Sequence, residues 1–514
     1  MKMHWLYQKT LVISFLVFLS CCSGCLTPSD NDNSAQKDTL VLGVLLKETI
    51  YPLGVTHDNF WTIVPNIFNG LVEFDENFRI IPVLAVSWNN PDNLTWRFYL
   101  RQGVRFHTGD RFTAEDVKYS FDTMSSSFDT IISNITTVDE YTVELRTYQP
   151  YPDLLERLAH TGIIFSKNVA EKEGAVLIGT GPYRLVDYEL DNYTTLERFD
   201  EYWGENPYIK TAVFRAIEDD DARLDALLSG AIDIADYNVD ERFDEIRQEQ
   251  NITVVIYPPL STYLIGFDVR QNGSYGYPDG KNPTADVRVR TAIYQAINIT
   301  PLIEGPFQGL AEPESQLFTL YVFGYDPTIE RLPYNLSSAR QLLAEAGYEQ
   351  GFNITLDCIT EGYPYNAENC YLITQQLSLV GIHVRMNNLS VVDFNRKVVS
   401  ERNTSMYLVG WGTISVDGGW FYDLFIRSMG EDVGALNSGY YSNPEVDRLG
   451  IAASQQMDPE ERLRLLQQGF WIALVDDVTV IPLFSQELLI LTANDIDLTP
   501  RADLRIVVKD MRFD

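Results

Sequence analysis

The chain has 514 residues, and its 72 acidic and 39 basic side chains give a formal net charge of −33 at pH 7. A charge of this sign repels phosphate backbones and anionic membrane surfaces, which makes nucleic acid a poor partner. With 45% hydrophobic residues, the chain is long enough to build more than one core, and we expect a globular protein with several lobes.

The first 24 residues have the pattern of a secretory signal. Lys2 and Lys9 precede an apolar run over residues 11–22, and small residues follow it. The run is about a dozen residues long, whereas a membrane-spanning helix needs about 20. We therefore expect residues 1–24 to direct export and to be removed.

The signal ends in the sequence SGC at Cys25, which is similar to the box at which lipoproteins are cut before a lipid-bearing cysteine. Cys25 would then be the new N-terminus, although Cys22 stands where an aliphatic residue is usual. Lipidation at Cys21 or Cys22 is the alternative. Residues 25–38 are polar and poor in apolar side chains, which predicts a flexible tether between anchor and body.

Ten asparagines begin an Asn-x-Ser/Thr acceptor for N-glycosylation. From 29 Asn and 63 Ser plus Thr, about three or four acceptors would arise by chance. The excess predicts a glycosylated, extracellular protein. The acceptors begin at Asn93, Asn134, Asn192, Asn251, Asn272, Asn298, Asn335, Asn353, Asn388 and Asn403.

Two further cysteines, Cys358 and Cys370, remain if Cys25 carries lipid. An even pair outside the cell favours a disulfide, with two buried free thiols as the alternative. The spacing lacks the second cysteine pair of a zinc site, and the histidines of the exported chain form no spaced pair. We expect no bound metal and no cofactor. These histidines are His57, His107, His160 and His383.

The body begins with short strands that alternate with amphipathic helices. The pattern predicts a strand over residues 39–46, a helix over 60–71, and two strands over 183–187 and 192–199. No fixed-period repeat interrupts this alternation, which excludes solenoids and filament arrays.

A helix is predicted after Thr113, with Thr113 as its N-terminal capping residue. Asp116 is its third residue, while Val117, Phe121 and Met124 form an apolar face.

Two helices are predicted near the C-terminus from their capping residues. Asn443-Pro444 and Asp458-Pro459 each place a capping side chain before a proline at the first helical position. A buried strand is predicted over residues 478–484. The alternation of strands and helices favours α/β lobes. The apolar face of the second helix consists of Leu463, Leu466, Phe470 and Leu474.

Residues 67–124 carry a resemblance to a known family. The segments IFNGLVEFDENFRIIPVLAVSW and TWRFYLRQGVRFHTGDRFTAEDVKYSFDTM resemble the extracellular solute-binding proteins of family 5, the peptide and nickel receptors of ABC importers. The resemblance covers about residues 39–484. Later segments follow in the order of the family: GTGPYRLVDY (179–188), ADVRVRTAIYQAIN (285–298), ARQLLAEAGY (339–348) and GYYSNPEVDRL (439–449).

The resemblance implies an α/β fold of the class II periplasmic-binding-protein type, with two lobes, a hinge and an inserted third domain. It also implies that the lobes close around a ligand. The implied first lobe comprises residues 39–71, 175–268 and 482–514, the inserted domain residues 72–174, and the second lobe residues 269–481.

The segment over residues 406–425 offers the apolar and polar groups that a ligand cleft needs. Trp411 ends an apolar strand, and a glycine-rich loop follows with Asp417, Trp420 and Tyr422. In peptide receptors of the family, an Asp three residues after the corresponding Trp holds the α-ammonium of the peptide, but Ile414 stands there in this chain.

An apolar side chain at that position cannot supply the charge-assisted bond to a free N-terminus. We expect either that Asp417 replaces it or that Asp417 has a role within its loop. Tyr263 and Trp61 are further candidates for the cleft, with aromatic core packing as the alternative for each, as for Trp420.

The function implied is that of a lipid-anchored receptor on the outer face of the cell membrane. It would act as a monomer and deliver a peptide or similar small oligomer to an ABC permease. A nickel complex, a sugar or a sensory signal is the alternative ligand. An extracellular hydrolase is the alternative from another class, but the chain lacks His-Glu-x-x-His and Gly-x-Ser-x-Gly, and we expect no enzyme activity. A surface-layer role would require repeats, which the chain also lacks.

Overall fold

The computed structural model describes residues 37–44, 62–123, 128–167, 177–237, 242–271, 281–361, 364–412 and 415–514. Met1–Lys37 and Asp38–Asp514 are two separate units, and the fold is that of the second. Cys25, Trp61 and Ile414 lie outside the described residues. Within those ranges, no helix has both the length and the apolar character needed to cross a membrane.

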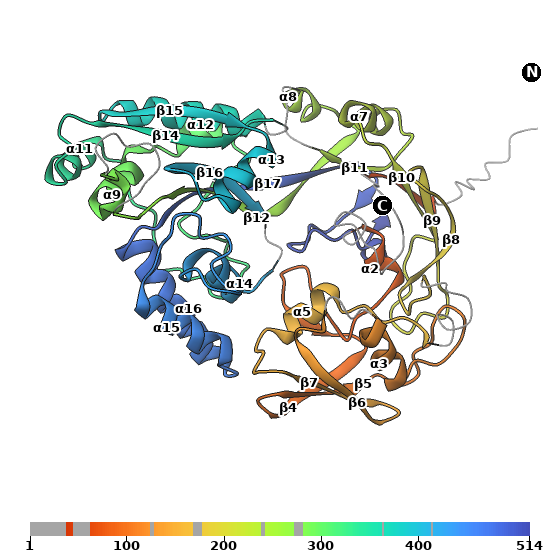
Figure 1. Ribbon diagram of the computed structural model, residues 1–514. Coiled ribbons are helices and arrows are strands. Elements are labelled where there is room, and N and C mark those ends of the chain that lie inside the picture. The colour runs from red at the N-terminus through yellow and green to blue at the C-terminus, as the bar shows by residue number, and fades with distance from the viewer. Residues whose placement is uncertain are drawn as a thin grey trace, which may run out of the picture. The chain divides into compact units, whose positions relative to one another are not determined.

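One mixed sheet runs through the unit in the strand order β15-β14-β16-β12-β17-β11-β1-β10-β9-β8, and β13 also pairs with β17 (Figure 1). The pairs β1·β10, β1·β11, β14·β15 and β14·β16 are parallel. The mixture of strands and helices confirms the α/β class. The strands are β1 (Thr39–Val44), β8 (Tyr183–Glu189), β9 (Tyr193–Arg198), β10 (Thr211–Ala216), β11 (Ile234–Tyr237), β12 (Ile252–Phe267), β13 (Ala311–Pro313), β14 (Phe352–Ile359), β15 (Ile382–Leu389), β16 (Met406–Gly412) and β17 (Val480–Ala493).

Two long antiparallel strands, β12 and β17, connect the two halves of this sheet. We call β1, β8–β11 and the parts of β12 and β17 beside them the first lobe, and β13–β16 with the other parts of β12 and β17 the second lobe. The β12·β17 register shifts between Tyr257 and Ser261. Pro258 and Pro259 lie in this shift, and proline has no N–H to donate to a neighbouring strand. The ladder is therefore interrupted where the chain leaves one lobe for the other.

The hydrophobic cores also change along these strands. Tyr257 of β12 and Ile490 of β17 pack in a first-lobe cluster, whereas Tyr263 and Phe484 pack in a second-lobe cluster. Each strand thus serves two cores in succession, which is the arrangement expected at a hinge.

The first lobe adds short helices and the C-terminal segment to its strands. The helix expected over residues 60–71 is wrong in length, because α2 covers only Val64–Ile67. The side chain of Asn66 bonds the backbone of Ile506 and Val508, and extended backbone begins at Phe68. The other elements are β2 (Val72–Phe74), β3 (Ile80–Pro82), α7 (Asp220–Leu228), α8 (Phe243–Ile246), β18 (Ile496–Asp497), η5 (Val508–Asp510) and β19 (Arg512–Phe513).

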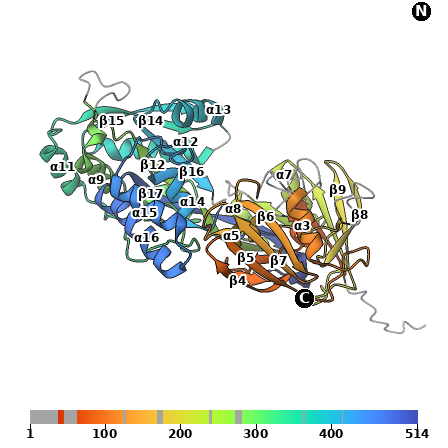
Figure 2. The ribbon, with the colours of Figure 1, turned by 60° about the horizontal axis from the view of Figure 1, so that its bottom comes forward.

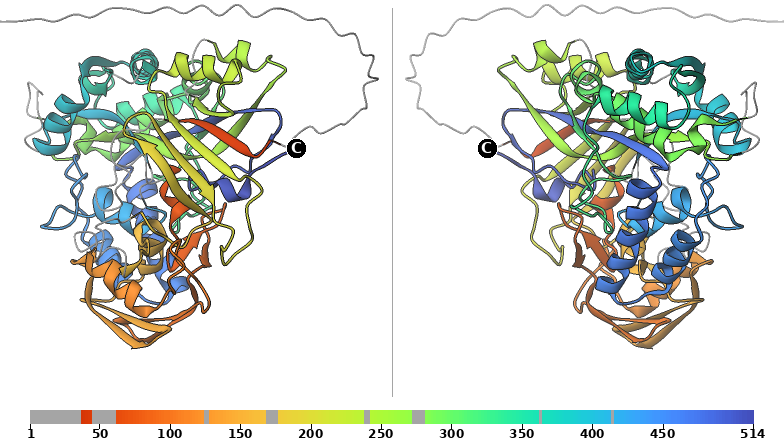
Figure 3. Two further views of the ribbon diagram at one scale, coloured as in Figure 1. Left: turned by 90° about the vertical axis from the view of Figure 1, so that its right-hand side faces the viewer. Right: turned by 90° about the vertical axis from the view of Figure 1, so that its left-hand side faces the viewer.

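A second sheet, in the order β4-β5-β7-β6, forms with α3 and α5 what we call the inserted part. It lies at the opposite end of the unit from α7 and α8 (Figure 3). At the start of α3, Asp116 Oδ2 accepts hydrogen bonds from the backbone N–H and the hydroxyl of Thr113, so the carboxylate of the predicted pair reaches back as expected, while the Thr113 hydroxyl donates and does not itself cap a helix N–H. The elements are β4 (Ala85–Asp92), β5 (Thr95–Leu100), α3 (Ala114–Thr123), β6 (Ile132–Asp139), β7 (Thr142–Thr147) and α5 (Leu154–Thr161).

Helices cover the sheet of the second lobe, and both predicted caps are confirmed. Asn443 accepts from the N–H of Glu445, and Asp458 accepts from the N–H of Glu461. Leu466, Phe470 and Leu474 are buried as predicted, whereas Leu463 is only partly buried. The helices are η1 (Pro283–Ala285), α9 (Val287–Ala296), α10 (Thr300–Glu304), α11 (Leu336–Glu345), α12 (Pro364–Ser378), α13 (Val391–Phe394), η2 (Asn395–Ser400), α14 (Gly418–Phe421), η3 (Tyr422–Ile426), α15 (Pro444–Gln455), α16 (Pro459–Trp471) and η4 (Ile472–Asp476).

A disulfide joins Cys358 of β14 to Cys370 of α12. This is the pairing expected from the sequence. Both cysteines are fully buried in the second-lobe core, so the bond fixes α12 on the sheet.

Candidate functional site

The aromatic residues expected in the cleft meet where β16 ends. The ring of Trp411 lies 5.4 Å from that of Phe425 in an edge-to-face contact, and 6.3 Å from that of Trp420. Trp411 and Trp420 are both partly exposed. The two indoles therefore present apolar surface at the end of β16, and their contact with a ligand stays a prediction.

A polar row crosses the sheet beside Trp411. Thr262 of β12 is opposite Trp411 on one side and opposite Ser485 of β17 on the other. Directly opposite residues project from the same face of a sheet. The hydroxyl of Ser485 donates to Oε1 of Glu314 at 2.6 Å. Trp411, Thr262, Ser485 and Glu314 thus form one row at the hinge, which we call the hinge row.

Two buried polar atoms of the hinge row have no hydrogen-bond partner in the part of the chain that the structure describes. Among the described residues, neither Nε1 of Trp411 nor Oγ1 of Thr262 has a hydrogen-bond partner, and Thr262 is fully buried. Leaving such a group unsatisfied costs about 1–3 kcal/mol. The indole N–H can only donate and the hydroxyl can donate or accept, so a ligand oxygen suits both.

Glu314 adds a titratable group to the row. Its side chain is buried, and burial raises its pKa to about 7, while the hydrogen bond from Ser485 opposes the shift. Sequence reasoning missed Thr262, Ser485 and Glu314. The two-residue period of a strand was the available signal for Thr262, because it puts Thr262 and Tyr263 on opposite faces.

Tyr263 and Tyr422 have core positions in this structure. The ring of Tyr263 stacks on Phe484 with centroids 4.8 Å apart, and its hydroxyl lies 3.4 Å from Oε1 of Gln486. The hydroxyl of Tyr422 donates to the carbonyl of Val446 at 2.8 Å. Tyr263 therefore packs in the aromatic core, which was the alternative interpretation.

Asp417 is held by an arginine from α16. Its carboxylate accepts from Nη1 and Nη2 of Arg462 at 2.5 and 2.6 Å, and from the N–H of Gly419 at 2.7 Å, which caps α14. The side chains of Asp417 and Arg462 are only 6% and 7% exposed. A ligand ammonium would have to displace Arg462 to reach this carboxylate.

A glutamate of the inserted part reaches the segment just before Asp417. Glu156, in the first turn of α5, accepts at Oε1 from the hydroxyl of Ser415 and from the N–H of Val416, each at 2.9 Å. Val416 itself packs in the core cluster shared by the first lobe and the inserted part. The helix α14, which follows this segment, lies near α5 in Figure 2.

A cavity of about 290 Å³ opens beside this contact, between the inserted part and the second lobe. Tyr151 and Asp153 border it from one side, and Trp420, Tyr422 and Asp423 from the other. Burial raises the pKa of Asp153 to about 7 and that of Glu156 to about 8, and the negative charge of Asp417 adds to both shifts. The pKa values of two carboxyl groups at this junction are thus raised toward neutral pH.

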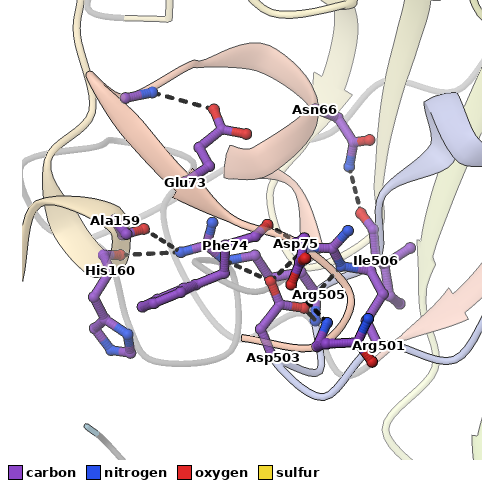
Figure 4. Close-up of polar contacts among 12 residues, drawn as sticks. Asn66, Glu73, Phe74, Asp75, Ala159, His160, Arg501, Asp503, Arg505 and Ile506 are labelled. Atoms are coloured by element: carbon purple, nitrogen blue, oxygen red, sulfur yellow. Dashed lines mark hydrogen bonds and ion pairs between the residues drawn. The ribbon is translucent and has the colours of Figure 1, made fainter. Parts of the chain in front are cut away.

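The far end of α5 is fixed by the C-terminal segment (Figure 4). Nη2 of Arg505 donates to the carbonyls of Ala159 and His160 at 2.7 and 3.3 Å. Positive charge at a helix C-terminus is favourable, because the last carbonyls carry partial negative charge. Arg501 donates to the carbonyl of Phe74, and Asp503 accepts from Arg501. A larger cavity of about 390 Å³ adjoins this segment, away from the aromatic candidates.

The described histidines and acidic residues make no metal site. Within the described ranges, no group of three or more His, Cys, Asp or Glu residues is arranged to hold an ion. Nε2 of His107 lies 3.0 Å from the carbonyl of Gly181, and burial lowers its pKa to about 4. His107 therefore acts as a neutral, structural group at neutral pH.

Comparison with known proteins places these features in a family. The family model of the bacterial extracellular solute-binding proteins, family 5, matches residues 79–431. The glutathione-binding protein GsiB of Salmonella typhi is 26% identical over 454 residues, which cover 85% of this chain and 86% of that protein.

Two solved structures have the same fold. HbpA2 from Haemophilus parasuis superposes with a TM-score of 0.82 at 22% identity, covering 93% of this chain and all of that chain. The periplasmic binding protein DppA from Helicobacter pylori, in complex with the peptide STSA, gives 0.68 at 23% identity, covering 93% and 98%. The family consists of binding proteins of ABC transporters, not of enzymes.

Proposed function

Because the chain belongs to the bacterial extracellular solute-binding proteins of family 5, we propose that it captures a peptide or similar small oligomer and delivers it to the permease of an ABC importer. The observation that carries this proposal is the pair of strands β12 and β17, each of which passes from one core to another at the junction of the lobes. Lobes joined in this way can rotate about the crossing and close on a solute without altering it.

The two unpartnered polar atoms of the hinge row support a peptide-like ligand, to which they would bond once the lobes rearrange around it. The N–H of Trp411 suits a carbonyl or carboxylate oxygen, and the hydroxyl of Thr262 suits either an oxygen or an amide N–H. The indoles of Trp411 and Trp420 supply apolar contact. The relatives GsiB and DppA, which bind glutathione and a peptide, favour the same ligand class.

The ligand amine is not expected to depend on Asp417. Its carboxylate already bonds Arg462 and caps α14, so a free N-terminus would compete with a buried guanidinium. We propose that Asp417 braces the loop and that carbonyl recognition at the hinge row contributes most of the polar specificity.

The direct experiment is mass spectrometry of the protein after gentle purification under non-denaturing conditions. An intact small oligomer that dissociates unchanged on unfolding supports the proposal. A chemically converted product, or turnover of peptides or glycosides by the pure protein, would favour the hydrolase instead.

Removal of the Trp411 indole tests the site itself. Trp411→Ala is expected to weaken binding of the co-purified ligand by at least tenfold, because it deletes both a donor and a large apolar contact. The control is Trp471→Ala, since Trp471 is 40% exposed on α16 and outside the hinge row. Calorimetric titration measures both, and equal affinity in the two variants contradicts the assignment.

The proposal also covers how the protein is anchored and modified. We propose that Cys25 carries lipid on the outer face of the membrane and that exposed acceptors such as Asn93, Asn134 and Asn388 carry glycans. Intact-mass analysis of the native protein and of Cys25→Ser tests the anchor, which the variant should lack. Enzymatic deglycosylation should lower the mass of the native protein, and an unchanged mass would contradict glycosylation.

A further inference from the structure

We propose that Glu156 is a proton-operated latch between the inserted part and the second lobe. The contact it makes, to Ser415 and Val416, joins parts of the chain that are about 260 residues apart in sequence. It goes beyond ligand capture, because it describes how the junction of the lobes is held whether or not a ligand is present.

The segment on the second-lobe side is well placed to be held or released. Its own lobe fixes it through Phe323, whose N–H donates to the carbonyl of Val416 and whose carbonyl accepts from the N–H of Gly418. The inserted part fixes it through Glu156 Oε1 and through the packing of the Val416 side chain. Loss of the Glu156 contact therefore removes one of the two ties between the parts and leaves the backbone bonds of the loop to Phe323 in place.

The charges around Glu156 are mostly negative. Asp153 lies one turn away, at the N-terminus of its own helix, and Asp417 and Asp423 face the junction from α14 and η3. Arg462 of α16 is bonded to Asp417, and Asp423 pairs with Arg427 at 3.0 Å. Tyr151 and Arg157 complete the titratable groups on the side of the inserted part.

These nearby acidic groups favour the protonated form of Glu156 when the latch is closed. A neutral carboxyl group still accepts two hydrogen bonds at its carbonyl oxygen, and it places no charge beside Asp153 and Asp417. When the parts separate, water reaches the group and its ordinary pKa of 4.5 is restored. Burial in the closed latch raises the pKa to about 8.

The sign of the pH dependence follows from these two values. Because the pKa is higher when the latch is closed, closing takes up a proton between pH 4.5 and 8. The latch is strongest below pH 4.5, weakens about tenfold per pH unit above it, and loses this contribution as the pH rises through 8. Asp153, whose pKa burial raises from 3.8 to about 7, acts in the same direction. Acid thus favours the closed junction.

Hydrogen exchange at two amides of the same segment tests the latch. The N–H of Val416 donates to Glu156 across the junction, whereas the N–H of Gly418 donates to Phe323 within the second lobe. Corrected for intrinsic chemistry, the protection of Val416 is expected to fall at least tenfold between pH 6 and pH 8, while that of Gly418 stays constant. Equal pH profiles for the two amides would overturn the proposal.

Variants separate the latch from general instability. Glu156→Gln keeps an acceptor oxygen but cannot ionise, so it is expected to lose most of the pH dependence at Val416. The double variant Asp153→Asn, Glu156→Gln should lose all of it. Glu140→Gln, at an exposed turn of the inserted part, should behave like the native protein. A pH dependence that persists unchanged in the double variant contradicts the latch, and protection of Gly418 reports folding in each case.

Discussion

Replacing Arg462 by methionine is expected to lower the free energy of unfolding by about 3–5 kcal/mol, because it leaves the buried carboxylate of Asp417 without its counter-charge. Asp417 would keep only the N–H of Gly419, and the nearby carboxyl group of Asp423 offers no positive charge in place of the guanidinium. Denaturant unfolding followed by circular dichroism measures the loss.

Two variants control this result. Arg464→Met removes an exposed arginine from the same helix, where Arg464 pairs with Glu461, and should cost at most about 1 kcal/mol. The double variant Asp417→Asn, Arg462→Met removes both charges and should cost less than Arg462→Met alone. If Arg462→Met unfolds at the same denaturant concentration as Arg464→Met, the pair does not brace the loop.

Asp503→Ala is expected to destabilise the first lobe by a similar amount, about 3–5 kcal/mol. Asp503 is almost fully buried and accepts from Nε and Nη2 of Arg501 at 2.8 and 2.6 Å, with Nε of Arg505 at 3.7 Å. Without it, two largely buried guanidinium groups face each other across the C-terminal segment (Figure 4). The loss of stability is measured by denaturant unfolding.

Hydrogen exchange locates the effect of Asp503→Ala. The amide of Val508, which donates to Asn66, should lose protection, because the segment no longer holds α2 and the end of α5. The control Asp497→Ala removes an exposed partner of Arg512 and should change stability by at most about 1 kcal/mol. Equal stability of the two variants would contradict a clamping role for Asp503.

Local sequence signals predicted the elements that depend on local chemistry. The capping patterns at Thr113, Asn443 and Asp458 indicated where α3, α15 and α16 begin. The strands expected over residues 183–187 and 192–199 match β8 and β9. The helix expected over residues 60–71 ends earlier than predicted, at Ile67, where Asn66 bonds the distant C-terminal segment, a tertiary contact that no local pattern contains.

The strand expected over residues 478–484 shows a different limit. β17 begins at Val480 and continues to Ala493, because its later residues pair with β11 and with the start of β12. An apolar run indicates that a strand is buried, but not that it passes from one core to another. The hinge therefore followed from the family resemblance and not from the residues alone.

For the candidate site, the sequence indicated where the aromatic residues lie, and their role in binding stays a prediction. The sequence predicted that Trp411 lies at the end of an apolar strand, and the ring of Trp411 does lie 6.3 Å from that of Trp420. The partner of Asp417 could not be predicted from the sequence, because Arg462 follows 45 residues later on another helix. The contact of Glu156 with Val416 joins residues that are 260 positions apart, and hydrophobic periodicity carries no information about such contacts.

The central claim, that two lobes close around an unaltered solute, is tested most directly by a distance between them. Spin labels at exposed positions of α7 and α11 allow this distance to be measured by double electron–electron resonance, with and without the co-purified ligand. A shift of the distance distribution to a shorter value on ligand addition, reversed when the ligand is washed out intact, is the predicted result. One distribution that stays the same with saturating ligand would contradict the hinge and, with it, this account of the function.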